Sequence, residues 1–290
     1  MMRIMLFLAT NAAVLVLISI VFQVLGLEGI LAENGVDLNL QALLVMSAVI
    51  GFGGSFISLA MSKFMAKRAM GVQLIEQPRN QTEQWLLDTV RRQAGEAGIG
   101  MPDVGIFHAP EPNAFATPGG FIYISRGLLA QMNSEDELAG VLAHEISHVT
   151  QRHHARQAGR SLGAGLLTIP GRAVGIVSRD LGNMINAPIE AAGQVYLASF
   201  SRSQETEADA VGLKLSAAAG YDPMGMSTFM RRLDQRERLL IGAPRNPTFF
   251  DTHPGTRERA SMNAMRSREL RWARDPSLGD TRERLLDRVD

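Results

Sequence analysis

The stretch Ala143-His144-Glu145-Ile146-Ser147-His148 places two histidines four residues apart, with a glutamate directly after the first. In an α-helix, residues at this spacing lie one above the other on the same face. The two imidazoles can therefore bind one zinc ion together, while Glu145 is placed to act as a general base toward a water molecule beside the metal rather than as a ligand. The pattern predicts a zinc site that activates water.

The residues before this stretch predict the start of a helix. Ser134 followed by Glu137 forms a capping box, and the acids Glu135 and Asp136 lie where the helix dipole favours negative charge. The two histidines are therefore expected on a well-defined helix. Its buried face is indicated by apolar residues at helical spacing, namely Leu138, Val141, Leu142, Ile146 and Val149.

A catalytic zinc ion needs a third protein ligand and one open position. His154 stands ten residues after His144, as in one known class of zinc peptidases, but that class has a glycine where this chain has Gln151. The helix is therefore expected to continue through Arg152, so that His153 and His154 point away from the zinc.

Glu205 is the stronger candidate for the third ligand. A second helix is expected to begin at Ser201 and to end at Gly220. Glu205 and Asp209 are four residues apart and share one face of it, so Glu205 can bind zinc while Asp209 accepts a ring N–H from a zinc-bound histidine. Glu207 points elsewhere and is expected to be solvated.

A late histidine, His253, lies in a proline-rich loop. It could stabilise the oxyanion of a tetrahedral intermediate, occupy the open zinc position in the resting protein and inhibit it, or simply cap the loop. Arg259, six residues later, could support that loop or bind the substrate carbonyl.

These motifs together resemble the HtpX family of zinc endopeptidases, which are relatives of the CAAX prenyl proteases. The resemblance extends from the N-terminus to about Ala260 and includes Met1-Met2-Arg3-Ile4, Ile75-Glu76-Gln77-Pro78-Arg79-Asn80 and Asn113-Ala114-Phe115-Ala116-Thr117. It implies a membrane-anchored, cytoplasm-facing heat-shock protease, active in the stress response, that cuts misfolded membrane proteins.

The chain departs from that family between the metal helix and Glu205. Two further long apolar segments would be expected there, but the interval is short and carries Arg172, Arg179 and Asp180. The stretches 150–156 and 219–224 are more similar to BepA-type periplasmic metalloproteases, which maintain outer-membrane assembly. The difference leaves the substrate open and the zinc chemistry unchanged.

Composition narrows the possible functions. The chain has 290 residues, a formal net charge of zero and no cysteine. The absence of cysteine excludes a disulfide framework and a thiolate zinc site. The net charge of zero does not indicate a nucleic-acid partner, and the sequence contains no phosphate-binding loop. The length suits a membrane segment followed by one catalytic domain of about 200 residues.

Two apolar segments, Ile4 to Leu27 and Leu38 to Met61, are each long enough to cross a bilayer. No small-x-small cleavage site follows the first, so an uncleaved anchor is expected rather than a signal peptide. In the second, Ser47, Gly51 and Ser55 form a small-residue stripe that would allow close helix packing in lipid.

The charged residues that flank these segments predict their orientation. The loop between them carries three acids and no Lys or Arg, whereas Arg3 precedes the first segment and Lys63, Lys67 and Arg68 follow the second. Positive residues stay in the cytoplasm. We therefore expect residues 1–69 to form a two-helix anchor in a bacterial inner membrane, with the catalytic domain, residues 70–290, facing the cytoplasm.

Within the domain, a linker over 70–80, a helix over 82–97 and strands over 104–108, 113–117 and 121–125 are expected. The last two strands form a hairpin. In zinc peptidases an edge strand beside the metal helix binds the substrate as an added strand. The candidate for that edge is Asn113, Ala114, Phe115 and Ala116, the alternative being an ordinary structural hairpin.

Within residues 159–200, the apolar stretch from Leu162 to Val177 is broken by Pro170, Gly171 and Arg172. It is too short and too charged for a third membrane span. Two amphipathic helices are expected there, lying over the active site as a lid or on the membrane surface. Either arrangement could control access to the site. A further helix is expected from Asp222-Pro223 to about Leu240.

The predicted fold class is α+β: an N-terminal transmembrane helical hairpin, then a mostly helical, gluzincin-like zincin domain with a small β-sheet. The predicted reaction is endoproteolytic hydrolysis of polypeptides, with one zinc ion held by His144, His148 and Glu205, and with Glu145 and His253 as catalytic groups. Two alternatives are a prenyl-protein protease with a lipid-lined chamber and a membrane-tethered holdase with a structural zinc site. A structural site would be closed by a fourth protein ligand.

Overall fold

The structure is a computed structural model that describes residues 71–117, 120–168, 171–172, 175, 178–239, 249, 253–254 and 256–278. All of these belong to one of the two units into which the chain divides, Ala66–Asp290. The predicted membrane hairpin over 1–69 lies outside the described residues. Within the described part, no helix combines the length and the apolar character that a membrane span requires.

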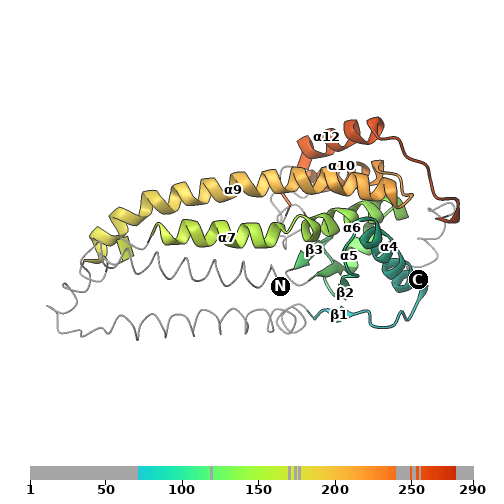
Figure 1. Cartoon of the computed structure of the whole chain (residues 1–290), viewed down its shortest axis with the longest axis horizontal. Helices are drawn as coiled ribbons and strands as arrows, with labels where there is room; N and C mark the ends of the chain where they lie inside the picture. The colour runs from blue at the N-terminus through green and yellow to red at the C-terminus, as the bar shows by residue number, and fades with distance from the viewer. Residues whose placement is uncertain are drawn as a thin grey trace. The chain divides into compact units, whose positions relative to one another are not determined.

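The described residues form a four-stranded mixed sheet with helices packed beside it (Figure 1). The strands follow the spatial order β1-β2-β4-β3, in which β2 and β4 are parallel and the other two pairs are antiparallel. Strand β3 is therefore an edge strand. The four strands are β1 Gln73–Leu74, β2 Asp103–Phe107, β3 Ala114–Thr117 and β4 Phe121–Ser125.

Three of these strands agree with the predicted ones to within one residue. The expected β3–β4 hairpin is present, because Ala114 pairs with Ile124 and Thr117 pairs with Phe121. The predicted linker over 70–80 was wrong in one respect, since β1 lies within it and pairs with β2. A two-residue strand is too short to produce an alternating pattern in the sequence.

Helix α4, Gln81–Glu96, packs against the metal helix. Asn80 caps it by accepting a hydrogen bond from the Glu83 N–H. Leu86, Val90 and Ala94 are buried in the main core. This confirms the helix predicted over 82–97.

Helix α6, Glu135–Thr150, carries the HExxH residues through the centre of the domain and is buried over most of its length. Ser134 caps it as predicted, accepting from the Glu137 N–H at 3.2 Å. The helix does not continue through Arg152, however, so that prediction was wrong. Arg152 adopts a left-handed conformation with φ of 52°, which ends α6 and starts α7 at His153.

Helices α7, His153–Leu166, and α9, Arg179–Ala218, run side by side away from the sheet (Figure 1). The predicted helix start at Ser201 was wrong, because that residue lies in the middle of one continuous 40-residue helix. The predicted end was right: α9 ends at Ala218, and Gly220 follows with φ of +81°. Pro188 lies inside the outer part of α9.

The remaining described helices close the domain around α6. Helix α5, Arg126–Gln131, is capped by Ser125 and connects the sheet to α6. Helix α10, Met224–Leu239, packs against both α6 and α12, Thr256–Glu269, and a short 3-10 helix spans Pro276–Leu278. The Asp222 carboxylate accepts from the Met224 N–H, which confirms the predicted helix start.

Close backbone contacts fix α6 against its neighbours. A Cβ atom at Gly212 of α9 would lie 3.0 Å from the His144 nitrogen, and one at Gly225 would lie 2.2 Å from the Asp136 carbonyl oxygen. Only glycine permits such approaches. The α+β part of the predicted fold class is therefore confirmed: a mostly helical domain with a small mixed sheet, organised around α6.

Candidate metal centre

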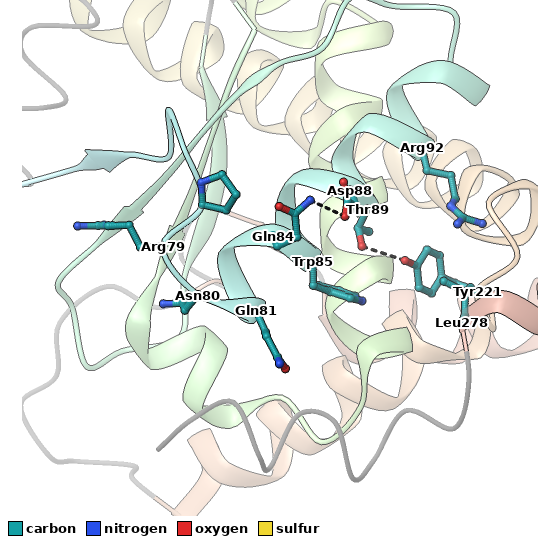
Figure 2. Close-up of a pocket in the computed structure, with 11 residues that line it drawn as sticks. Arg79, Asn80, Gln81, Gln84, Trp85, Asp88, Thr89, Arg92, Tyr221 and Leu278 are labelled. Carbon is teal, nitrogen blue, oxygen red and sulfur yellow. Dashed lines mark hydrogen bonds between the residues drawn. The ribbon is translucent and has the colours of Figure 1, made fainter.

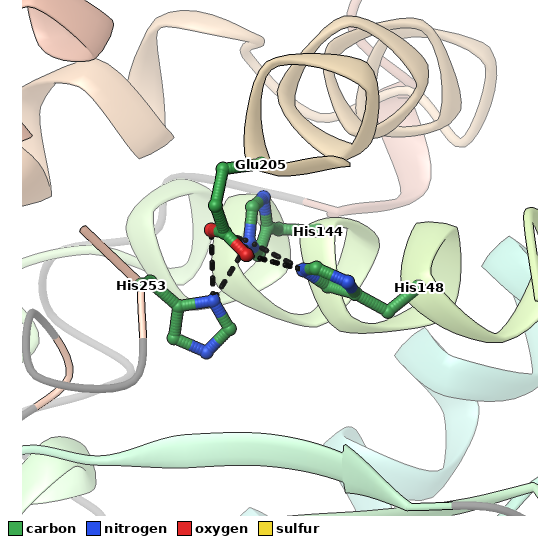
Figure 3. Close-up of side chains that lie close together, drawn as sticks. All are labelled: His144, His148, Glu205 and His253. Atoms are coloured by element: carbon green, nitrogen blue, oxygen red, sulfur yellow. Dashed lines mark hydrogen bonds and ion pairs between the residues drawn. The ribbon is translucent and has the colours of Figure 1, made fainter. Parts of the chain in front are cut away.

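Four side chains from three separate segments of the sequence meet beside α6 (Figure 3). His144 and His148 come from α6, Glu205 from α9, and His253 from the segment before α12. All four are buried, and one potential ligand atom of each lies within 4.8 Å of the others. The structure thus brings together the three predicted zinc ligands and His253.

The distances between these atoms suit a tetrahedral metal ion. The Nε2 atoms of His144 and His148 are 3.1 Å apart. Glu205 places Oε2 3.3 Å from His144 Nε2 and Oε1 3.4 Å from His148 Nε2. Zinc with bonds of about 2.0–2.1 Å separates its tetrahedral ligand atoms by about 3.3 Å. The nitrogen and oxygen donors also match the preference of zinc, so the residues fit this metal.

His253 lies on the side of the three ligand atoms where a fourth would be. Its Nδ1 is 3.3 Å from His144 Nε2 and 2.9 Å from Glu205 Oε2. The Phe249 ring stacks on the His253 ring with centroids 4.2 Å apart. The other ring nitrogen of His253, Nε2, lies 3.3 Å from Glu145 Oε1. This position is compatible with both chemical roles predicted for His253.

Asp209 and Arg259 contact side chains of the centre but are not among its four potential ligands. Asp209 Oδ1 lies 3.0 Å from His144 Nδ1, the ring nitrogen that faces away from the cluster. The Arg259 guanidinium donates to both oxygens of Asp209 at 2.7 Å and lies 2.9 Å from Glu205 Oε2. It also donates to the carbonyls of His253 and Pro254 at 3.1 Å.

Arg259 is more central than the sequence indicated. It was expected to support the loop or a substrate carbonyl, and it does contact that loop. It also joins Asp209 and Glu205, which lie about fifty positions earlier in the chain. Its spacing from His253 was the only available signal, and that spacing does not reveal a partner on α9.

The environment acts differently on the two histidines of α6. Burial lowers the pKa of His148 well below its ordinary value, and the neighbouring His144 lowers it further. Burial also acts to lower the pKa of His144, but hydrogen bonds to Asp209 and Glu205 outweigh it and raise that pKa to about 9. A cation bound at His144 Nε2 must therefore displace a proton that these carboxylates favour.

Both carboxylates keep their negative charge despite being buried. Burial raises the pKa of Asp209, but hydrogen bonds from Arg259 and His144 hold it well below its ordinary value. Burial likewise raises the pKa of Glu205, and the nearby His253 and His144 lower it well below the ordinary value. The ionised Glu205 can therefore bind a cation, and the ionised Asp209 can accept the Nδ1 hydrogen of His144.

Glu145 is oriented by the edge strand. Its carboxylate is almost fully buried, and Oε2 accepts a hydrogen bond from the Ala116 N–H at 2.8 Å. Oε1 lies near His253, but among the described residues no group donates a hydrogen bond to it. One oxygen is thus fixed while the other faces the cluster, which is the geometry that a general base toward water needs.

The four residues predicted to bind substrate are placed unequally. Ala114, Phe115 and Ala116 lie in β3, which borders α6, and the Ala114 oxygen is 3.4 Å from His253 Nε2. Asn113 lies just before the strand, and its main-chain N–H and C=O are both bonded to Ser125. Only the Asn113 side chain is therefore available to a ligand.

The expectation that His153 points away from the zinc site was wrong. Because α6 ends at Thr150, the left-handed Arg152 turns the chain back and brings His153 Nδ1 to 2.9 Å from His148 Nδ1. Glu207 is not simply solvated either: it contacts His153 and Arg156. His154 lies outside the group of four potential ligands, as the sequence indicated, but its ring centroid is 6.3 Å from that of His148, so it does not point away from the site either.

A cavity of about 600 Å³ lies along α4, apart from the metal centre (Figure 2). Trp85 and Thr89 line it, and Thr89 Oγ1 is 2.9 Å from the hydroxyl of Tyr221. None of the four clustered side chains lines this cavity. The cavity along α4 and the metal centre are therefore separate sites.

Comparison with known proteins places these observations in a family. Residues 80–268 match the model of peptidase family M48. Protease HtpX of Thioalkalivibrio sulfidiphilus (strain HL-EbGR7) is 62% identical over 153 residues, which cover 51% of this chain and 52% of that protein. The matched part thus spans about half the length of this relative.

Longer matches exist with other members. Protease HtpX of Pseudomonas fluorescens (strain Pf0-1) is 40% identical over 284 residues, which cover 89% of this chain and 92% of that protein. These matches confirm the resemblance inferred from the motifs, and the buried group of four fits the one zinc ion predicted per chain. The chain that builds this centre therefore belongs to peptidase family M48, among relatives called Protease HtpX.

Proposed function

We propose that this protein is a zinc-dependent endopeptidase that hydrolyses peptide bonds of polypeptide substrates. The observation that carries the proposal is the spacing of the three ligand atoms of His144, His148 and Glu205. Beside them, Glu145 Oε1 accepts no hydrogen bond from the described residues. A site of three protein ligands and an adjacent base is the arrangement of catalytic rather than structural zinc.

The chain's own residues divide the work as follows. When zinc is bound, it supplies a Lewis acid that polarises a carbonyl and lowers the pKa of water. Glu145 Oε1 accepts a proton from a water molecule and later delivers it to the leaving amine. The Ala116 N–H holds Glu145 in place, and Asp209 holds the His144 ring. The His253 side chain donates to the developing oxyanion.

His253 has a second role in this proposal, in the resting protein. Its Nδ1 faces two ligand atoms at 3.3 Å and 2.9 Å, where a fourth ligand would be. In that position it blocks the place that water must occupy. Access of a substrate then requires His253 to move, and the Arg259 contacts to the carbonyls of residues 253 and 254 control how easily it does so.

We further propose that the substrate backbone binds along β3. Strand β3 is an edge strand of the described sheet. The side chains of Ala114 and Ala116 are small and buried, so they leave room for a substrate backbone beside it. His253 currently lies 3.4 Å from the Ala114 oxygen. An added peptide strand would compete for that oxygen, so binding of substrate and release of His253 would be linked.

The proposed cellular role rests on the N-terminal sequence and on the relatives of this chain. Two long apolar segments precede the domain, and the relatives are called Protease HtpX. Together they support an inner-membrane protease, with its catalytic domain in the cytoplasm, that degrades misfolded membrane proteins under stress. In this proposal the helices over 159–200 act as a lid or lie on the lipid surface.

The test is cleavage of an unfolded membrane protein by the purified chain, with zinc and with a chelator. Glu145→Gln should lower kcat/KM about 10²- to 10⁴-fold while leaving bound zinc unchanged, because it removes the base and not a ligand. Glu190→Gln, at an exposed position of α9, is the matched control and should cleave normally. Equal activity of the Glu145 variant would refute the assigned base.

A structural zinc site in a tethered holdase is the second candidate, and the position of His253 favours it. Four protein ligands would close the site permanently. Cleavage by the unmodified chain separates the two candidates, because a variant without His253 would also lack the proposed oxyanion donor. If the zinc-loaded, unmodified chain cleaves nothing but prevents aggregation of an unfolded protein, the holdase is supported and the peptidase proposal fails.

A further inference from the structure

We propose that His153 and Glu207 form a hydrogen-bonded pair that positions the ring of His148 for metal binding. This inference rests on the proposed zinc function and assigns a role to two residues outside the ligand set. Neither residue is among the four whose ligand atoms cluster together. His153 is 2% exposed, and a buried polar side chain requires a partner.

The contacts run in one line from the metal centre to the surface. His148 turns Nε2 toward His144 and Glu205, and its other ring nitrogen, Nδ1, lies 2.9 Å from His153 Nδ1. His153 Nε2 in turn lies 3.3 Å from Glu207 Oε2, and that oxygen also accepts from Arg156 at 2.8 Å.

The chemistry of imidazole allows one arrangement of hydrogens along this line. A histidine that binds metal through Nε2 carries its hydrogen on Nδ1. His148 Nδ1 therefore donates, and His153 Nδ1 must be the acceptor. A neutral His153 then carries its hydrogen on Nε2, where it can donate to the Glu207 carboxylate. Each polar atom along the line has a partner of the right kind.

The two metal-binding histidines of α6 are thus supported in parallel but unequal ways. His144 has a carboxylate, Asp209, directly behind its ring at 3.0 Å. His148 has a neutral ring behind it, and the carboxylate of Glu207 lies one residue further out and is partly exposed. His153 therefore fixes the orientation of His148 without placing a second buried charge next to it.

The backbone is built to hold His153 in that position. Arg152 is the only non-glycine residue with positive φ among the described residues, and this conformation directs the chain back toward His148. The Gln204 amide of α9 donates to the His153 carbonyl at 3.3 Å. Left-handed residues cost free energy and persist where the surrounding structure requires them.

The experiment measures metal affinity directly. The full chain is purified in detergent, stripped of metal and titrated with Zn²⁺ against a chromophoric chelator. Loss of a partner behind a ligand histidine weakens metal binding about 10- to 100-fold. We expect that loss in His153→Ala, a smaller loss in Glu207→Ala, and recovery in His153→Gln, whose amide oxygen can accept from His148 Nδ1. Cobalt substitution adds a second readout, because its visible spectrum reports ligand geometry.

Two matched controls come from the same chain. His108→Ala removes an exposed histidine, and Glu190→Ala removes an exposed glutamate from α9. Both should bind zinc as the unmodified chain does. Thermal unfolding of the metal-free variants identifies any variant that has lost its fold, in which case His153→Gln carries the test.

The possible outcomes are distinct. A weaker zinc affinity and an altered cobalt spectrum in His153→Ala, both reversed in His153→Gln, would support the inference. Unchanged affinity and spectrum in His153→Ala would overturn it, as would a loss that His153→Gln does not reverse at all. If the unmodified chain binds no zinc, the proposed function itself fails. If it binds zinc and cleaves, while His153→Ala matches it, only the inference fails.

Discussion

The two halves of helix α9 belong to one continuous element but have opposite environments. The inner half, 201–218, packs against α6 and contributes Glu205, Asp209 and a close glycine contact to the metal centre. The outer half, 179–200, has few buried residues, and Val195 and Met184 are 70% and 68% exposed. The helical backbone is continuous through both halves. Their side chains alone distinguish the half that contributes to the metal centre from the half that is mostly exposed.

The largest expected difference between the halves is electrostatic. Among the described residues, Asp209→Ala would leave the buried Arg259 guanidinium with only Glu205 as an ion-pair partner. We therefore expect it to lower the free energy of unfolding by about 3 kcal/mol. Glu190→Ala in the outer half should change it by less than about 0.5 kcal/mol. Denaturant unfolding of the metal-free protein measures both, and similar values for the two variants would contradict the contrast.

Glycine substitutions should have opposite signs in the two halves. Gly212→Ala would place a Cβ 3.0 Å from the His144 nitrogen, and we expect a net loss of about 1 kcal/mol of stability. A Cβ at Gly193 meets only the Ala164 Cβ, at 3.7 Å. Gly193→Ala should therefore stabilise the helix by about 0.5–1 kcal/mol. Unfolding curves of the two variants should shift in opposite directions; a gain at position 212 would be inconsistent with tight packing there.

The turn at Arg152 sets where the packed region ends and the helix beside the outer half of α9 begins. Arg152→Gly relieves the left-handed conformation and Arg152→Ala does not, since only glycine adopts φ of 52° freely. We expect the glycine variant to be about 1 kcal/mol more stable than the alanine variant. Thermal or denaturant unfolding compares them, and equal stability would mean that the turn adopts another conformation in solution.

The smallest effect is expected at the exposed apolar surface. Met184→Gln replaces a largely exposed side chain by one of similar size, so the free energy of unfolding should change by less than about 0.5 kcal/mol. Partition onto lipid vesicles should decrease in the same variant if the outer half lies on a membrane. A loss of more than 1 kcal/mol in detergent would instead reveal a packing partner for this surface.

The sequence predicted best those features that depend on neighbouring residues. Ser134 and Glu137 lie close in the chain, so the start of α6 could be inferred from local hydrogen bonding alone. Gly220 marked the end of α9 in the same way. The chemical pattern of residues 143–148 was sufficient for the metal-binding helix, and the spacing of Glu205 and Asp209 was sufficient for their common face.

The errors came from long-range structure. Ser201 is a good helix cap in isolation, but the chain is already helical when it reaches that residue. Arginine has no preference for a left-handed conformation, so nothing at position 152 indicated that α6 would end there. The ion pairs of Arg259 with Asp209 and Glu205 join segments about fifty residues apart. A single sequence, read by itself, carries no signal for such pairs.

The contact between Ala116 and Glu145 has a consequence for how this protein tolerates mutation. Strand β3 holds the carboxylate through a main-chain N–H, so no particular side chain encodes the contact and proline is the only residue that removes the donor. A saturation library at position 116 should therefore show a sharp loss of cleavage activity for proline. Large side chains should also lower activity, because position 116 is buried. Libraries at Phe115 and Thr117 should show graded effects. If β3 binds substrate as proposed, its side chains could therefore diversify without displacing Glu145.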